Sequence, residues 1–180
     1  MSLFASSLIP GIILLLLGLP LALDISGVTA AIRAFPRSAP AGYVVFSAAA
    51  AWFLWDILHL SNADFGEYRL YLFIGFALIA ALSFKCVPDF LGVRGACALV
   101  LIGASPFLGS AFMEYAHPAR LFMVSIVYVA LALAIWVGAQ PWRLRDFFGW
   151  LFARSGRARA LGGFFVVYGI VLCGVAFALR

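Results

Sequence analysis

Two carboxylate–histidine pairs with the same spacing are the residues in this sequence best suited to chemistry. Asp56 and His59 are three positions apart, and so are Glu114 and His117. Residues i and i+3 of a helix are neighbours about 5–6 Å apart, so each pair can present a carboxylate and an imidazole together. A carboxylate-x-x-His pair from each of two helices supplies half of the ligands of a carboxylate-bridged two-metal site. The four side chains are therefore candidate metal ligands.

The residues around these pairs also support a purely structural interpretation. His117 precedes Pro118, which disfavours the helical conformation at His117. Asp64 and Glu67, which could supply the remaining carboxylates, fall in a short polar turn rather than on a helix. Outer loops of membrane proteins tolerate acids, because lysine and arginine carry the topological signal. The pattern also fits His59 or His117 as a ligand of a haem- or chlorophyll-type tetrapyrrole.

Asp56 raises a separate question because it lies inside an apolar run. If a membrane span begins near Ala41, Asp56 lies about 15 residues into it, or roughly 22 Å along the helix axis. A charge at that depth costs several kcal/mol unless it is paired. His59 and Arg69 are the nearest candidate partners, so Asp56 and Arg69 are predicted as buried charges. The favoured interpretation is a structural ion pair, and the alternative is a proton-carrying or ion-binding carboxylate.

The composition requires that these residues sit in a membrane. Of the 180 residues, 66% are apolar and only 11% are charged, whereas soluble domains are about half apolar and a quarter charged. A membrane-spanning helix needs about 20 predominantly apolar residues. The sequence predicts an all-α, polytopic transmembrane helical bundle in one domain, 1–180, with six spans in three hairpins. These spans cover about residues 3–23, 41–60, 68–84, 95–113, 121–139 and 161–179.

The basic residues predict the orientation of these spans. Nine lie in the loops after the first, third and fifth spans: Arg33, Arg37, Lys85, Arg94, Arg143, Arg145, Arg154, Arg157 and Arg159. Three lie on the other side: Arg69, Arg120 and Arg180. Because basic loops stay in the cytoplasm, both termini are expected on the non-cytoplasmic side of a bacterial-type inner (plasma) membrane. This sorting also explains the net charge of +5 without a nucleic-acid partner.

The three predicted cytoplasmic loops share an Asp-x-x-Gly opening: Asp24–Gly27, Asp89–Gly92 and Asp146–Gly149. The first and last loops continue with apolar residues at helical spacing, which predicts short helices lying in the interfacial layer. Two interpretations remain open, namely three related hairpins or a common need for helix caps.

The last of these loops carries Arg154, Arg157 and Arg159 beside an amphipathic stretch. Such clusters can bind anionic lipid head groups, although they can also be topological signals alone. Two tyrosines, Tyr128 and Tyr168, fall in mid-span. Because a buried phenol needs a hydrogen-bond partner, each is expected to face another helix.

These features favour one function over two alternatives. No phosphate-binding loop, nucleophile elbow, zinc-protease motif or dinucleotide-binding motif is present, so no catalytic residue is predicted. Small-residue patches at Ser47–Ala51, Ala77 with Ala81, and Gly169 with Gly174 would let other helices approach closely. The sequence therefore predicts a non-catalytic membrane subunit that stabilises or organises a larger complex, with lipids and other membrane subunits as partners.

The first alternative is a small transporter or channel that uses Asp56, supported by a predicted kink at Pro106 between two glycines. The second is a membrane metal or redox protein built on the outer histidine–carboxylate cluster.

Overall fold

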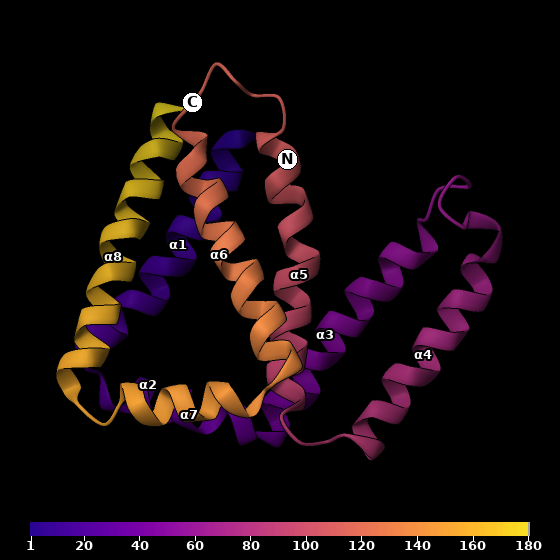
Figure 1. The fold of residues 1–180 in the computed structure, drawn as a ribbon, viewed down its shortest axis with the longest axis horizontal. Helices are drawn as coiled ribbons and strands as arrows, with labels where there is room; N and C mark the ends of the chain where they lie inside the picture. Colours follow the sequence, from indigo (N-terminus) through magenta and orange to yellow (C-terminus); the bar gives the residue numbers. More distant parts are fainter. Residues whose placement is uncertain (180) are drawn as a thin grey trace. The chain divides into compact units, whose positions relative to one another are not determined.

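The computed structural model describes residues 1–179 and confirms the all-α prediction, since the described part of the chain is 83% helical and contains no strand. Six helices are long and apolar enough to cross a membrane. They are α1 (Leu3–Ala22), α3 (Ala39–Leu58), α4 (Arg69–Cys86), α5 (Leu91–Ala111), α6 (Arg120–Ala139) and α8 (Ser155–Ala178) (Figure 1). Arg180, which the sequence assigns to the outer side, lies outside the described residues.

A serine caps the beginning of each of two spans, and a proline lies in the first turn of one of them. The Ser2 hydroxyl accepts a hydrogen bond from the Ala5 amide at the start of α1, and Ser38 does the same for Ala41 in α3, both at 3.3 Å. An N-cap hydroxyl satisfies one of the free amides that every helix start leaves unpaired. Pro40 falls in the first turn of α3, where its missing amide costs little.

The short helices differ between the three loops. The first contains α2 (Ser26–Ala34) followed by the 3-10 helix η1 (Phe35–Arg37), and the last contains α7 (Trp142–Leu151). The middle loop between α4 and α5 spans only residues 87–90 and holds no helix. The prediction of short helices is thus confirmed for two loops, and the helix–short helix–helix pattern appears twice.

Within the predicted single membrane domain, the chain forms two compact units. The first comprises Met1–Arg33, Gly103–Leu133 and Arg145–Arg180, and the second comprises Ala34–Ile102 and Ala134–Leu144. Each unit is described by itself below.

The first unit is built on close packing of α1 against α8. Five buried residues of α1 recur at intervals of four and three, namely Ser7, Gly11, Leu14, Gly18 and Leu21, and Ser6 is also buried. The buried residues of α8 recur at intervals of four, seven, three and four: Ala158, Gly162, Gly169, Leu172 and Ala176. This heptad spacing keeps one seam of each helix facing its partner. A Cβ built on Gly18 would lie 2.8 Å from the Gly162 carbonyl oxygen, and one on Gly11 would lie 3.1 Å from the Gly169 oxygen. The two helices are therefore antiparallel and touch through their backbones.

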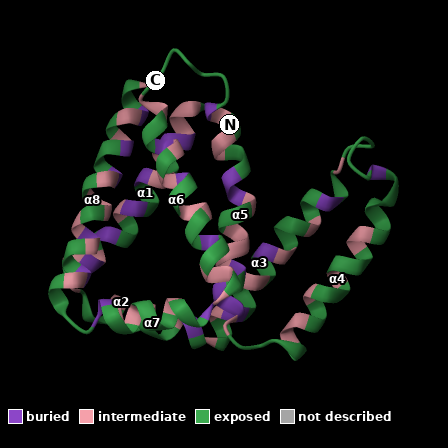
Figure 2. Ribbon diagram, in the orientation of Figure 1, coloured by how far each residue is buried: buried purple, intermediate pink, exposed green. Residues whose placement is uncertain are grey.

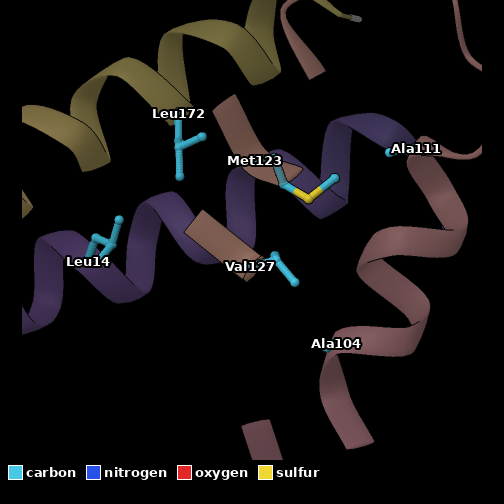
Figure 3. Packing of buried hydrophobic residues seen from close by; sticks show 6 residues of the cluster. All are labelled: Leu14, Ala104, Ala111, Met123, Val127 and Leu172. Carbon is cyan, nitrogen blue, oxygen red and sulfur yellow. The ribbon is translucent and has the colours of Figure 1, made fainter. Parts of the chain in front are cut away.

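Two apolar clusters extend this seam. Leu14 and Leu172 pack with Met123 and Val127 of α6 and with Ala104 and Ala111 of α5 (Figure 3). Leu21 and Ala158 pack with Leu151 and Phe152 at the end of α7. The first unit thus joins the first span to the last, a pairing that the three predicted hairpins do not include. It also brings together α6 and α8, the two spans of the third predicted hairpin.

The second unit contains the α3–α4 hairpin. The Phe84 ring stacks on the Tyr43 ring, with 5.4 Å between the ring centroids, and meets the Phe46 ring edge-on at a centroid distance of 5.2 Å. The Phe53 and Phe76 rings also meet edge-on, at a centroid distance of 5.1 Å. The start of α5 also lies against α3, because a Cβ on Gly95 would fall 2.6 Å from the Phe46 Cα. No residue of α4 is buried, as Figure 2 shows.

Candidate functional site

The Asp56–His59 pair lies at the very end of α3. The helix ends at Leu58, two residues before the predicted end, so Asp56 lies in the last turn and His59 is the C-cap. His59 Nδ1 is 2.8 Å from the Trp55 carbonyl oxygen, and its ring lies 4.4 Å from the Trp55 ring. The imidazole of His59 therefore interacts with the last turn of its own helix.

Asp56 forms neither of its predicted ion pairs. Within residues 1–179, its carboxylate makes no salt bridge to His59 or Arg69, and both Asp56 and Arg69 are exposed. The physical reason is the early end of α3, which leaves Asp56 two residues, or about 3 Å, from the last helical residue. Near a helix end an acid can reach the interfacial layer, so it needs no partner within the hydrocarbon.

The Glu114–His117 pair does not share a helix face. Both residues lie in the loop between α5 and α6, and the His117 amide donates to the Glu114 carbonyl at 3.2 Å in a turn. The premise of two helical carboxylate-x-x-His pairs is therefore wrong for this pair, and Pro118 supplies the reason. Arg120 closes the same loop by donating to the Ala111 carbonyl at 2.5 Å and stacking 4.9 Å over the Tyr115 ring.

The remaining predicted carboxylates also have local structural surroundings. Asp64 accepts a hydrogen bond of 2.8 Å from the Ser61 hydroxyl, within the turn that precedes η2 (Gly66–Tyr68). Glu67 lies in η2 itself. Throughout the described residues, no three histidine, cysteine, aspartate or glutamate side chains are grouped so that they could hold a metal ion. Asp56 and His59 belong to the second unit, and Glu114 and His117 to the first.

The three arginines predicted to bind lipid are distributed differently from the prediction. Because α8 begins at Ser155, Arg157 and Arg159 lie on its first two turns rather than in a loop. Arg157 donates to the Trp150 carbonyl at 2.8 Å and lies 4.4 Å over the Trp150 ring. Arg159 forms a salt bridge of 3.4 Å with Asp24. Arg154, the residue before α8, is exposed.

The predicted small-residue patches differ in whether the chain itself packs against them. Gly169 is used inside the chain against Gly11, whereas a Cβ on Gly174 would meet no atom within 4 Å. Ala49 is buried and Ala50 is half-buried, but Ser47, Ala48 and Ala51 on α3 are exposed. They belong to the small-residue face of α3, an exposed helix face formed by Val44, Ser47, Ala48, Ala51, Trp52 and Trp55. Ala81 on α4 is also exposed.

The helix α5 runs from Leu91 to Ala111 with Pro106 inside it, so the proline does not end the helix, and a kink there stays a prediction.

No protein-family model, curated protein or solved structure matches this chain.

Proposed function

We propose that the chain is a non-catalytic integral membrane subunit that packs against a larger membrane protein complex and stabilises or organises it. The observation that carries this proposal is α4, a span of membrane length in which no residue is buried by the chain. Beside it, α3 leaves its small-residue face uncovered. The α3–α4 hairpin is therefore the proposed contact surface.

The physical argument rests on how helices associate in lipid. Lipid tails are as apolar as leucine, so helix association depends on close van der Waals packing, which small residues permit. Ser47, Ala48 and Ala51 form the centre of the small-residue face, with Val44 at one end and Trp55 at the other. The chain uses the same device internally where Gly11 meets Gly169. A partner helix with a small-residue stripe fits this face.

We also propose the orientation, with both termini on the non-cytoplasmic side of a bacterial-type inner membrane. Its support is the unequal distribution of basic residues between alternate loops. In this orientation α2 and α7 lie at the cytoplasmic surface.

The proposed function is tested by native mass spectrometry of the tagged protein extracted gently from its own membrane. We expect a heteromeric complex of fixed stoichiometry. A lone chain or a homo-oligomer would overturn the proposal and redirect attention to Asp56 as a transport residue. Metal at one or two ions per chain in the same sample would instead support the outer histidine–carboxylate cluster.

A matched pair of variants tests the contact surface. Ala51→Phe places a large ring at the centre of the small-residue face, and it should reduce the co-purified partner by about tenfold, equivalent to roughly 1.4 kcal/mol. The control is Val167→Phe, on an exposed part of α8 that is 64% accessible. Equal partner recovery from both variants would exclude the α3 face as the contact.

A further inference from the structure

A cavity of about 320 Å³, open to the surface, lies within the first unit between α2, α7 and the residues that follow α7. Its lining residues are Arg33, Arg145, Phe148, Gly149, Phe152 and Ala153. Both helices can be located in Figure 1, α2 after the first span and α7 before the last. The cavity therefore combines two guanidinium groups, two aromatic rings and the surface of a glycine.

Arg33 is held in place at this cavity by the chain itself. One of its terminal nitrogens donates to the Phe152 carbonyl at 2.7 Å, and its guanidinium carbon lies 4.9 Å over the Phe152 ring. A guanidinium has five N–H donors in a rigid fork, so a single bond to a carbonyl leaves most of them for another acceptor. The side chain is thus pre-organised, which lowers the entropic cost of binding a ligand.

Arg145 supplies a second, only partly neutralised cation. Its Nε and one terminal nitrogen both donate to the same oxygen of Asp146, at 2.9 and 2.7 Å. The other terminal nitrogen is not used in this pair. Arg33, Arg145 and Asp146 together carry a net charge of +1, which matches a singly charged phosphodiester better than a doubly charged free phosphate.

The surroundings favour a lipid as the source of that phosphate. The segments 24–33 and 145–159 contain five arginines and two aspartates, a net charge of +3. Phe148 and Phe152 offer apolar walls beside the charged groups. Such a combination of cations with adjoining apolar surface suits a head group whose other end is hydrocarbon.

We infer that this cavity binds the phosphate of an anionic phospholipid between Arg33 and Arg145. Planar guanidinium groups match phosphate oxygens in paired hydrogen bonds, which a single ammonium cannot reproduce. The site is separate from Arg154, Arg157 and Arg159, two of which are engaged with Trp150 and Asp24. It does not depend on the proposed partner complex.

The test is a titration of the purified full-length protein in detergent, followed by native mass spectrometry. Three probes are compared: dioleoyl phosphatidylglycerol, dioleoyl phosphatidylcholine and inorganic phosphate. We expect one phosphatidylglycerol to bind at least about tenfold more tightly than phosphatidylcholine, whose choline cation the arginines repel. Equal binding of the two lipids overturns the inference, as does displacement of phosphatidylglycerol by inorganic phosphate at similar concentration, which would indicate a free-phosphate site.

Three variants locate the site. Arg33→Gln and Arg145→Gln should each weaken phosphatidylglycerol binding about tenfold, since one charged hydrogen bond is worth roughly that factor. Gly149→Leu should weaken it similarly by filling the cavity, because a Cβ at Gly149 meets no atom within 4 Å. This third variant removes no native contact, so it remains informative if Arg33→Gln fails to fold.

The controls make the same changes outside the cavity. Gly156→Leu adds the same side chain at another open glycine, and Arg37→Gln removes the charge of an exposed arginine four residues after Arg33 in the sequence. Both should leave binding within about twofold of the parent. Full binding in the Arg145→Gln and Gly149→Leu variants overturns the inference, and loss of binding only in Arg154→Gln would assign lipid recognition to the basic segment before α8 instead.

Discussion

At the scale of single residues, several hydroxyls in the spans donate to backbone carbonyls, among them those of Ser6, Ser83 and Ser125. The Tyr168 hydroxyl donates to the Phe122 carbonyl of α6 at 2.9 Å, as expected for a mid-span phenol. Tyr128, for which the same was expected, is 58% exposed. The sequence does not show which tyrosine forms a hydrogen bond to another helix, because both are phenols in apolar runs. Only the helix packing places one of them beside an acceptor.

These tyrosines provide a prediction with an internal control. Tyr168→Phe removes one hydrogen bond inside the membrane and should lower the free energy of unfolding by about 0.6 kcal/mol, with an upper value of about 1.7 kcal/mol. Tyr128→Phe should change it by much less. Chemical unfolding in mixed micelles measures both. A loss for Tyr128→Phe as large as that for Tyr168→Phe would contradict the assigned bond.

The predicted metal ligands lie at helix ends and in a turn rather than on two helix faces. Asp56 and His59 sit at a helix end because α3 stops at Leu58, while Glu114 and His117 lie in a turn. A shift of two residues in a helix boundary is within the ordinary uncertainty of sequence reasoning. Because of this shift, Asp56 lies near the helix end rather than deep in the span, so it does not need an ion-pair partner. For His117 the sequence already indicated a non-helical conformation, because Pro118 follows it.

At the scale of elements, glycines determine which helices pair. Gly11 and Gly18 of α1 are seven residues apart, as are Gly162 and Gly169 of α8. A Cβ on Gly162 would collide with the Ala22 amide nitrogen and with the Gly18 carbonyl oxygen. The sequence alone does not single out these glycines, because Gly149, Gly156 and Gly163 are also spaced by seven residues and a Cβ on any of them meets no atom within 4 Å.

This packing predicts a strong effect of one methyl group. Gly18→Ala places a Cβ 2.8 Å from the Gly162 oxygen and from the Phe165 Cβ. The overpacking should cost about 1–3 kcal/mol, which lowers the melting temperature by several degrees for a chain of this size. Gly174→Ala, where a Cβ meets no atom within 4 Å, is the control and should be neutral or stabilising. Thermal unfolding followed by tryptophan fluorescence compares the two, and equal melting temperatures would refute the close contact.

At the scale of the whole molecule, the alternation of basic and acidic loops gives the proposed orientation. Cys86, the last residue of α4, is exposed and follows Lys85 at the proposed cytoplasmic end of that helix. Ala116 is exposed in the loop between α5 and α6, on the proposed outer side. The two positions are therefore expected on opposite sides of the membrane.

A labelling experiment checks this expectation on the full chain. In intact cells, a membrane-impermeant maleimide should modify Ala116→Cys in a variant without the native cysteines. It should modify a variant retaining only Cys86 after the membrane is permeabilised and not before. The reverse pattern would invert the proposed topology.

The sequence by itself determined that the protein is helical and that six of its helices are long and apolar enough to cross a membrane, because apolar runs of about 20 residues satisfy their backbone in lipid as helices. Only the tertiary structure decided which helices pair. Three hairpins of neighbouring spans were expected, and α6 does contact α8 in the third of them. The expectation did not include the packing of α1 on α8 or of α3 on α4. Every span is apolar, with a mean hydropathy between 1.5 and 2.4, and this average does not say which residues of two helices face each other. Pairing depends instead on where small residues align across two helices, and that alignment appears only when both backbones are in place.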